Sequence, residues 1–68
     1  MKIVLIGAGN LATHLGKALL EAGHDIMQVY SRTMESASRL ATRAGGAPVT
    51  ALRAVRRDAE VYIMAVKD

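Results

Sequence analysis

The sequence predicts an α/β protein with a doubly wound parallel sheet, of which the chain supplies the N-terminal half. Two apolar runs, residues 3–6 and 61–66, have the continuous hydrophobicity of buried strands. Between them, segments at helical spacing alternate with short β-prone segments, which gives the order β-α-β-α-β-α-β. A glycine turn joins the first strand directly to the first helix. We expect the strand order 3-2-1-4, because parallel strands are joined by right-handed crossovers.

Length and composition restrict the class of protein. The 68 residues allow one domain, residues 1–68, and a chain of this size buries only about 60% of the surface its unfolded form exposes. Hydrophobic residues make up 51% of the chain but include only two aromatic ones, Tyr30 and Tyr62, so the core must consist of aliphatic, Ala and Met side chains. The absence of cysteine excludes disulfides and thiolate metal sites.

The apolar run at the start of the chain is too short for a membrane or export segment. It breaks at Gly7, polar residues follow from Asn10, and no stretch reaches the ~20 apolar residues of a membrane span. We interpret the run as a strand and expect a cytoplasmic protein without membrane contact.

The first half of the chain contains one predicted helix and a second strand. Apolar residues recur on one face between Asn10 and Ala22, and Gly23 stands where a left-handed C-cap is expected. The residues from Asp25 to Tyr30 then have the composition of a strand.

The second half begins with a polar turn. Thr33 is the expected N-cap of a helix that ends at Gly45-Gly46. A very short third strand, Ala47 to Val49, should lie at an edge of the sheet because it contains Pro48. A brief helix is then expected from Thr50 to about Arg57. The fourth strand, residues 61–66, should be covered on both faces in a complete fold.

A complete fold of this kind has two more strands and their helices. We therefore expect the chain to be a fragment of a longer protein. Its fourth strand should then form an exposed apolar edge through which copies of the chain associate as a homo-oligomer.

The glycine turn has the pattern G-x-G-x-x-A, formed by Gly7, Gly9 and Ala12. Gly7 permits a tight turn, Gly9 allows backbone to approach a pyrophosphate, and a small residue at Ala12 allows close packing of helix on sheet. The first amides of the helix lack partners within it, and its dipole is positive at this end. The turn therefore predicts a phosphate site that requires neither metal nor lysine.

The end of the second strand distinguishes between dinucleotides. An acidic residue is expected there when the ribose carries a free 2′-hydroxyl, but the sequence is Val-Tyr-Ser-Arg-Thr. Arg32 could pair with a 2′-phosphate, and the hydroxyls of Ser31 and Thr33 could donate to it. This interpretation favours NADP over NAD. The alternative is that Arg32 is a solvated surface residue and Thr33 only a helix cap, and for Thr33 the two interpretations are equally weighted.

Other polar residues support no second site. The two histidines, His14 and His24, are not expected to share a metal, and no metal site is predicted. The basic cluster of Arg53, Arg56 and Arg57 is interpreted as a solvated face; the net charge of +3 comes with too few aromatic residues for stacking on nucleic acid. No set of catalytic residues can be identified, so the catalytic groups are left unassigned.

The motifs together resemble a known family. The matching segments are residues 7–15, 29–33 and 62–68, which read GAGNLATHL, VYSRT and YIMAVKD. The chain resembles the N-terminal part of bacterial Rossmann-like NADP-dependent oxidoreductases that carry a C-terminal domain of unknown function. More distantly it is similar to pyrroline-5-carboxylate reductases and deazaflavin-dependent NADP reductases.

The resemblance implies an NADP(H)-binding fold in which the loop after the fourth strand lies along the cofactor. The expected cofactor-binding residues are Gly7, Ala8, Gly9, Asn10, Leu11, Ala12, Ser31, Arg32, Thr33, Ala65, Val66 and Lys67. In such families the pocket for the small-molecule substrate and the proton donors come mainly from later parts of the chain. The segment alone is therefore not expected to be catalytic.

Three functional hypotheses follow. The first is the dinucleotide-binding part of an NADP(H)-dependent oxidoreductase, in which the protein supplies orientation and electrostatics. The second is a non-catalytic NADP(H)-binding module for sensing or regulation. The third is a truncated fragment that binds nothing tightly.

Overall fold

The computed structural model describes residues 2–7 and 9–65, with the backbone alone at residues 9 and 10. The elements in chain order are β1 (Lys2–Gly7), α1 (Gly9–Glu21), β2 (Asp25–Tyr30), α2 (Met34–Ala44), β3 (Ala47–Val49), the 3-10 helix η1 (Leu52–Ala54) and β4 (Val61–Ala65). The described strands form one sheet in the order β3-β2-β1-β4, and each neighbouring pair is parallel. The predicted fold class and strand order are confirmed.

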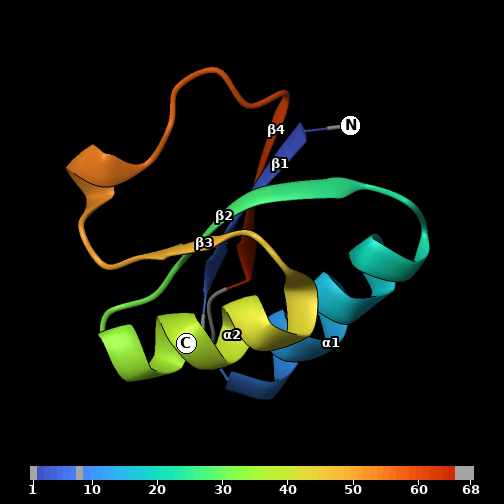
Figure 1. The fold of residues 1–68 in the computed structure, drawn as a ribbon, viewed down its shortest axis with the longest axis horizontal. Helices are drawn as coiled ribbons and strands as arrows, with labels where there is room; N and C mark the ends of the chain where they lie inside the picture. The colour runs from blue at the N-terminus through green and yellow to red at the C-terminus, as the bar shows by residue number, and fades with distance from the viewer. Residues whose placement is uncertain (1, 8, 66–68) are drawn as a thin grey trace.

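The two α-helices cover the same face of the sheet and contact each other (Figure 1). A single apolar core lies between helices and sheet; its buried members are Ile3, Leu5, Ala12, Ile26, Val29, Leu40, Ala44 and Ala65. These residues are aliphatic or alanine, as composition predicted. A core this small gives a low free energy of unfolding, so the loss of one close contact removes a large fraction of it.

The contact between the two helices depends on a residue without a side chain. A Cβ atom at Gly16 of α1 would lie 2.6 Å from the Cβ of Ala44 in α2 and 3.1 Å from Cδ2 of Leu5. Both distances are shorter than ordinary van der Waals contact. Gly16 therefore sets how closely α1 approaches both α2 and the sheet.

The helix ends follow local sequence rules. Gly23 has φ 87°, its N–H donates to Leu20 O at 3.0 Å, and the N–H of His24 donates to Leu19 O at 3.1 Å, which together make a Schellman C-cap for α1. Thr33 caps α2, because its Oγ1 accepts a 3.2 Å hydrogen bond from the N–H of Ser36. Both caps were predicted, although α1 begins and ends one residue earlier than expected.

The prediction of a helix from Thr50 to about Arg57 is wrong. Only a single 3-10 turn forms, its N-cap is Ala51, and no side chain caps it. The segment instead crosses the sheet face opposite α1 and α2, where side chains from the strands bond its backbone groups. These bonds occupy groups that a helix would have paired internally.

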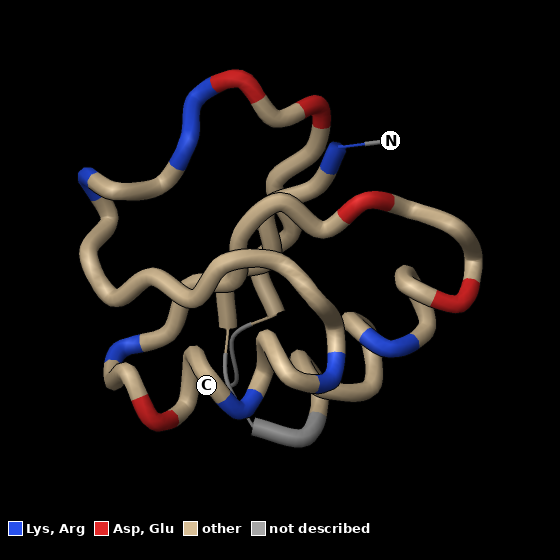
Figure 2. Tube along the Cα trace, viewed as in Figure 1, with Lys and Arg blue, Asp and Glu red and all other residues tan. Residues whose placement is uncertain are grey.

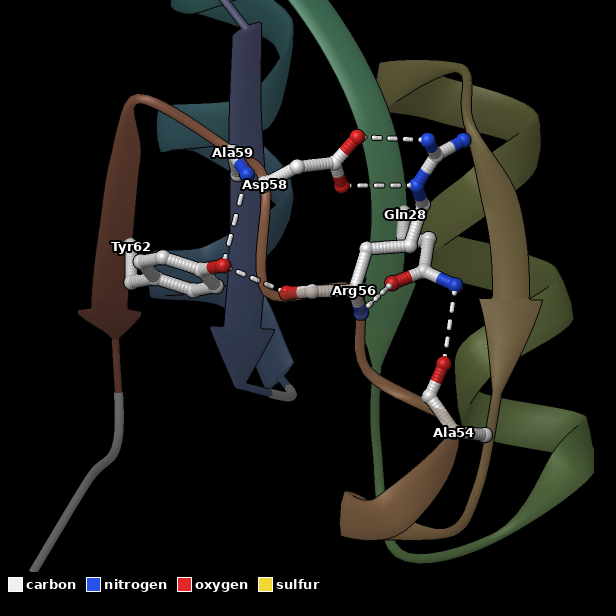
Figure 3. Close-up of polar contacts among 6 residues, drawn as sticks. All are labelled: Gln28, Ala54, Arg56, Asp58, Ala59 and Tyr62. Carbon is white, nitrogen blue, oxygen red and sulfur yellow. Dashed lines mark hydrogen bonds and ion pairs between the residues drawn. The ribbon is translucent and has the colours of Figure 1, made fainter.

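Gln28 holds this segment from the sheet side (Figure 3). The side chain is 8% exposed; its Oε1 accepts from the N–H of Arg56 at 2.7 Å, and its Nε2 donates to Ala54 O at 3.1 Å. The register of β1 and β2 slips at Met27, so Ile26 and Gln28 face opposite sides of the sheet. The slip points Gln28 toward the segment while Ile26 stays in the core.

Tyr62 of β4 holds the same segment near its other end (Figure 3). Its hydroxyl donates to Arg56 O and accepts a 3.4 Å hydrogen bond from the N–H of Ala59. The exposed Arg56 guanidinium contacts Asp58 through two bonds of 2.9 and 2.6 Å. The hydrogen bond from Arg56 lowers the pKa of the Asp58 carboxyl, and the same bond raises the pKa of Arg56.

The fourth strand is covered on one face only. Ala65 is buried and Val61 and Ile63 pack against the core, whereas Tyr62 is 42% and Met64 71% exposed. Cover on both faces was expected of the complete fold and stays a prediction. The strand also forms one end of the described sheet, as expected for an apolar edge.

None of the helices in residues 2–7 and 9–65 has the length and hydropathy of a membrane span.

Gly16→Val should lower the free energy of unfolding by about 2 kcal/mol, because the added carbons overlap Ala44 and Leu5. Urea denaturation followed by circular dichroism measures the change. Lys17→Val, at an exposed position of the same helix, should cost only about 0.5 kcal/mol. Equal losses of unfolding free energy in the two variants would show that α1 is not closely packed at Gly16.

Candidate functional site

The candidate site lies at the edge of the sheet where β1, β2 and β4 end. Because these strands are parallel, their carboxyl ends meet at this edge, and α1 and α2 both begin there (Figure 1). Of the predicted binding residues within the described part, those near Gly7, those around Arg32, and Ala65 are all brought to it. The fold therefore brings these residues, far apart in the sequence, to one edge of the sheet.

Gly7 is the residue at which β1 lies very close to both β4 and α1. It pairs with Ala65 in the β1–β4 ladder, and a Cβ atom on it would lie 2.4 Å from Ala65 O and 3.2 Å from the Cβ of Ala12. No side chain fits at this distance from a backbone carbonyl. Ala12 is fully buried beneath it, so the small residue at that position does allow the close packing of α1 on the sheet.

The beginning of α1 suits an anion. Its first turn contains no acidic residue, so none of its own side chains neutralises the positive end of the dipole. Leu11, which was expected to contribute here, is 59% exposed at this end of the helix. For Asn10 the structure describes the backbone only, within α1.

Ser31 differs from its expected role. The residue is 2% exposed, and its hydroxyl donates to Gly7 O, the last carbonyl of β1. Its backbone N–H donates to Val49 O at 3.2 Å. The hydroxyl hydrogen is thus already used within the protein, and sequence reasoning missed this bond because no spacing rule relates positions 7 and 31.

Arg32 and Thr33 are both exposed and precede α2. Within the described part of the chain, Arg32 has no ion pair, and Glu35, the nearest acid along the sequence, pairs with Arg39 at 2.8 Å. Thr33 uses an oxygen lone pair for the cap, which leaves its hydroxyl hydrogen available as a donor. The two roles weighed for Thr33 are therefore compatible.

Three predicted binding residues, Ala8, Val66 and Lys67, lie outside the described residues. Ala65 is 4% exposed and ends β4 directly beside Gly7. Its side chain belongs to the core, so any contact that it makes with a ligand would come from its backbone.

The remaining candidates lie away from this edge. In residues 2–7 and 9–65 no group of three His, Asp or Glu side chains could hold a metal ion. The arginines at positions 53, 56 and 57 are exposed on the segment between β3 and β4, where basic residues are followed directly by acidic ones (Figure 2). The exposure of these arginines and the acidic residues beside them agree with a solvated face.

Comparison with known proteins relates the chain to a family. The family model described as NADP oxidoreductase coenzyme F420-dependent matches residues 2–68. The chain belongs to this family. The description of this family agrees with the resemblance seen in the sequence. The predicted membership of a Rossmann-like NADP oxidoreductase family is therefore confirmed.

Two individual proteins support the assignment. A crystal structure from Bacteroides fragilis, described as a candidate NADP oxidoreductase, is 54% identical, superposes with a TM-score of 0.91, and is matched over 98% of this chain and 26% of its own. A glutamyl-tRNA reductase of Caldivirga maquilingensis is 36% identical over 66 residues, which are 94% of this chain and 16% of that protein. The chain spans about a quarter of the first and a sixth of the second.

The chain corresponds to the dinucleotide-binding part of the proteins in this family. A nicotinamide dinucleotide is the cofactor that the family and the crystal structure support. The chain's own geometry fits it: Gly7 tolerates no Cβ, the start of α1 has no acidic residue, and the exposed Arg32 after β2 has no ion pair with any residue that the structure describes.

Gly7→Ala should weaken the junction of β1 and β4, because the Cβ overlaps a backbone carbonyl that no rotamer change can move. We expect a loss of about 2 kcal/mol in the free energy of unfolding and faster amide exchange in β4. Gly23→Ala is the control: nothing lies within 4 Å of its Cβ position, so it carries only the strain of φ 87°. Unchanged exchange in β4 of Gly7→Ala would contradict the contact.

Proposed function

We propose that the chain binds NADP(H) through its phosphates, as the cofactor-binding part of an NADP(H)-dependent oxidoreductase. The pyrophosphate would be bound at the start of α1, by the backbone of Gly7, Ala8, Gly9, Asn10 and Leu11, with Ala12 packed below. The 2′-phosphate would be bound by the Arg32 guanidinium and the Thr33 hydroxyl, and the backbone at Ala65, Val66 and Lys67 would lie toward the nicotinamide ribose. When bound, NADPH supplies a hydride; the protein residues bind and orient it.

The exposed guanidinium of Arg32 is the observation that carries the proposal. It stands one residue before the N-cap of α2, where the positive end of the helix dipole disfavours a cation. Glu35 does not compensate this charge, because it pairs with Arg39. A phosphate bound here would interact favourably with both the arginine and the helix start.

The edge of the sheet at β4 supports a second proposal, self-association. We infer that β4 pairs with β4 of a second copy, because its outer edge is unpaired within the described sheet and Met64 is 71% exposed. Light scattering should show a dimer that becomes a monomer on dilution, and Met64→Lys should favour the monomer. A monomer at every concentration would exclude this pairing.

The cofactor proposal predicts that NADPH binds at least about tenfold more tightly than NADH, as a charge-assisted contact to the 2′-phosphate requires. Arg32→Ala should remove most of this difference by weakening NADPH alone. Isothermal titration calorimetry measures both affinities.

Arg39→Ala is the matched control, since it removes an exposed arginine that already has a carboxylate partner. This variant should keep the preference for NADPH. Equal affinities in the unaltered protein, or a preference for NADH, would refute the phosphate assignment.

A further inference from the structure

Ser31 joins two parts of the candidate site that are distant in sequence. Its hydroxyl donates to the carbonyl of Gly7, 24 residues earlier, and its own N–H donates to Val49 O in β3. The residue is 2% exposed, so these bonds are shielded from water. A buried hydrogen bond of this kind is costly to break, because a donor or acceptor left unsatisfied away from water carries the cost of its desolvation.

The two ends of this bond lead into different loops. Gly7 is the last residue of β1 before the turn into α1, and Ser31 is the residue directly before Arg32. The carbonyl of Gly7 is part of a planar peptide group, so fixing it fixes how the chain enters the turn. Fixing Ser31 likewise fixes where the chain leaves β2 toward Arg32 and the α2 cap.

We propose that Ser31 is a positioning residue that holds the glycine turn and the Arg32 loop at one separation, so that a single dinucleotide meets both. The inference rests on the proposed NADP(H) site and concerns the linkage within it. When two binding loops have a fixed spacing, a ligand that contacts one is already placed for the other, which raises the effective concentration of the second contact. Pre-formed spacing also avoids the cost of ordering the loops on binding.

This role differs from direct recognition of the 2′-phosphate by the Ser31 hydroxyl. The hydroxyl has one hydrogen, and Gly7 O accepts it. A donor to phosphate would matter for any ligand that carries the phosphate. A positioning residue matters only for ligands that reach both loops.

The experiment compares one long ligand with one short ligand. NADP⁺ spans both loops, whereas adenosine 2′-monophosphate reaches only the Arg32 loop. We expect Ser31→Ala to weaken NADP⁺ binding about tenfold, the factor for one lost hydrogen bond, and to leave binding of adenosine 2′-monophosphate unchanged. Ser31→Cys, which keeps a weak donor, should fall between the two and serves as the test variant if the alanine variant does not fold.

Ser38→Ala is the matched control, because Ser38 is an exposed serine in α2. It should change neither affinity. Equal weakening of both ligands by Ser31→Ala would overturn the proposal in favour of a direct phosphate contact. Unchanged NADP⁺ affinity would overturn it as well, since the bond would then be structural only.

A second readout needs no ligand and separates this proposal from the cofactor assignment. In Ser31→Ala, the backbone amide chemical shifts should change at both Leu11, in the first turn of α1, and Thr33, the N-cap of α2, and should stay unchanged there in Ser38→Ala. If the unaltered protein failed to bind NADP⁺, the cofactor proposal would fail and these shifts would decide the positioning role. Unchanged shifts at either residue would refute it.

Discussion

The close approach of backbone around Gly7 is the constraint on which the rest of the structure depends. At this residue β1 lies against the carbonyl of Ala65 on one side and accepts the Ser31 hydroxyl on the other, and Ala12 of α1 packs directly beneath. A side chain here would separate β4 from β1 or lift α1 from the sheet. In the proposed function, the same absence of a side chain would leave room for a phosphate. Close packing and the proposed binding would then both require a glycine at the place where β1, β4 and α1 meet.

Small residues allow the helices to pack very closely on each other and on the sheet, and the apolar core between them is small. Gly16 lets α1 approach Ala44, and alanines make up much of the interface between helices and sheet. The opposite sheet face has no α-helix among the described residues, and the segment between β3 and β4 covers part of it. Side chains of Gln28 and Tyr62 hold that segment through its backbone (Figure 3). Hydrogen bonds thus hold this segment to the sheet, whereas apolar packing holds the helices to the other face.

The sequence predicted the elements that depend on residues close to one another in the chain. The alternation of apolar patterns predicted four parallel strands and their order, Thr33 and Gly23 predicted helix ends, and Pro48 predicted an edge strand. The helix after Thr50 was wrong, because Gln28 and Tyr62 bind that segment from elsewhere in the fold. The Ser31–Gly7 bond was missed for the same reason. Both depend on contacts between distant residues, about which the local pattern contains no information. The binding roles of individual residues, Arg32 above all, stay predictions.

Membership of the NADP oxidoreductase family and the geometry at the end of β2 both support the proposal that a dinucleotide lies across the starts of α1 and α2. The most direct measurement is the map of backbone amide chemical-shift changes on adding NADP⁺ to the isotope-labelled protein. The account predicts changes at Leu11 and at both Arg32 and Thr33, with the exposed face of β4 unaffected. Changes confined to Tyr62 and Met64, or absent from the residues around Arg32, would contradict it.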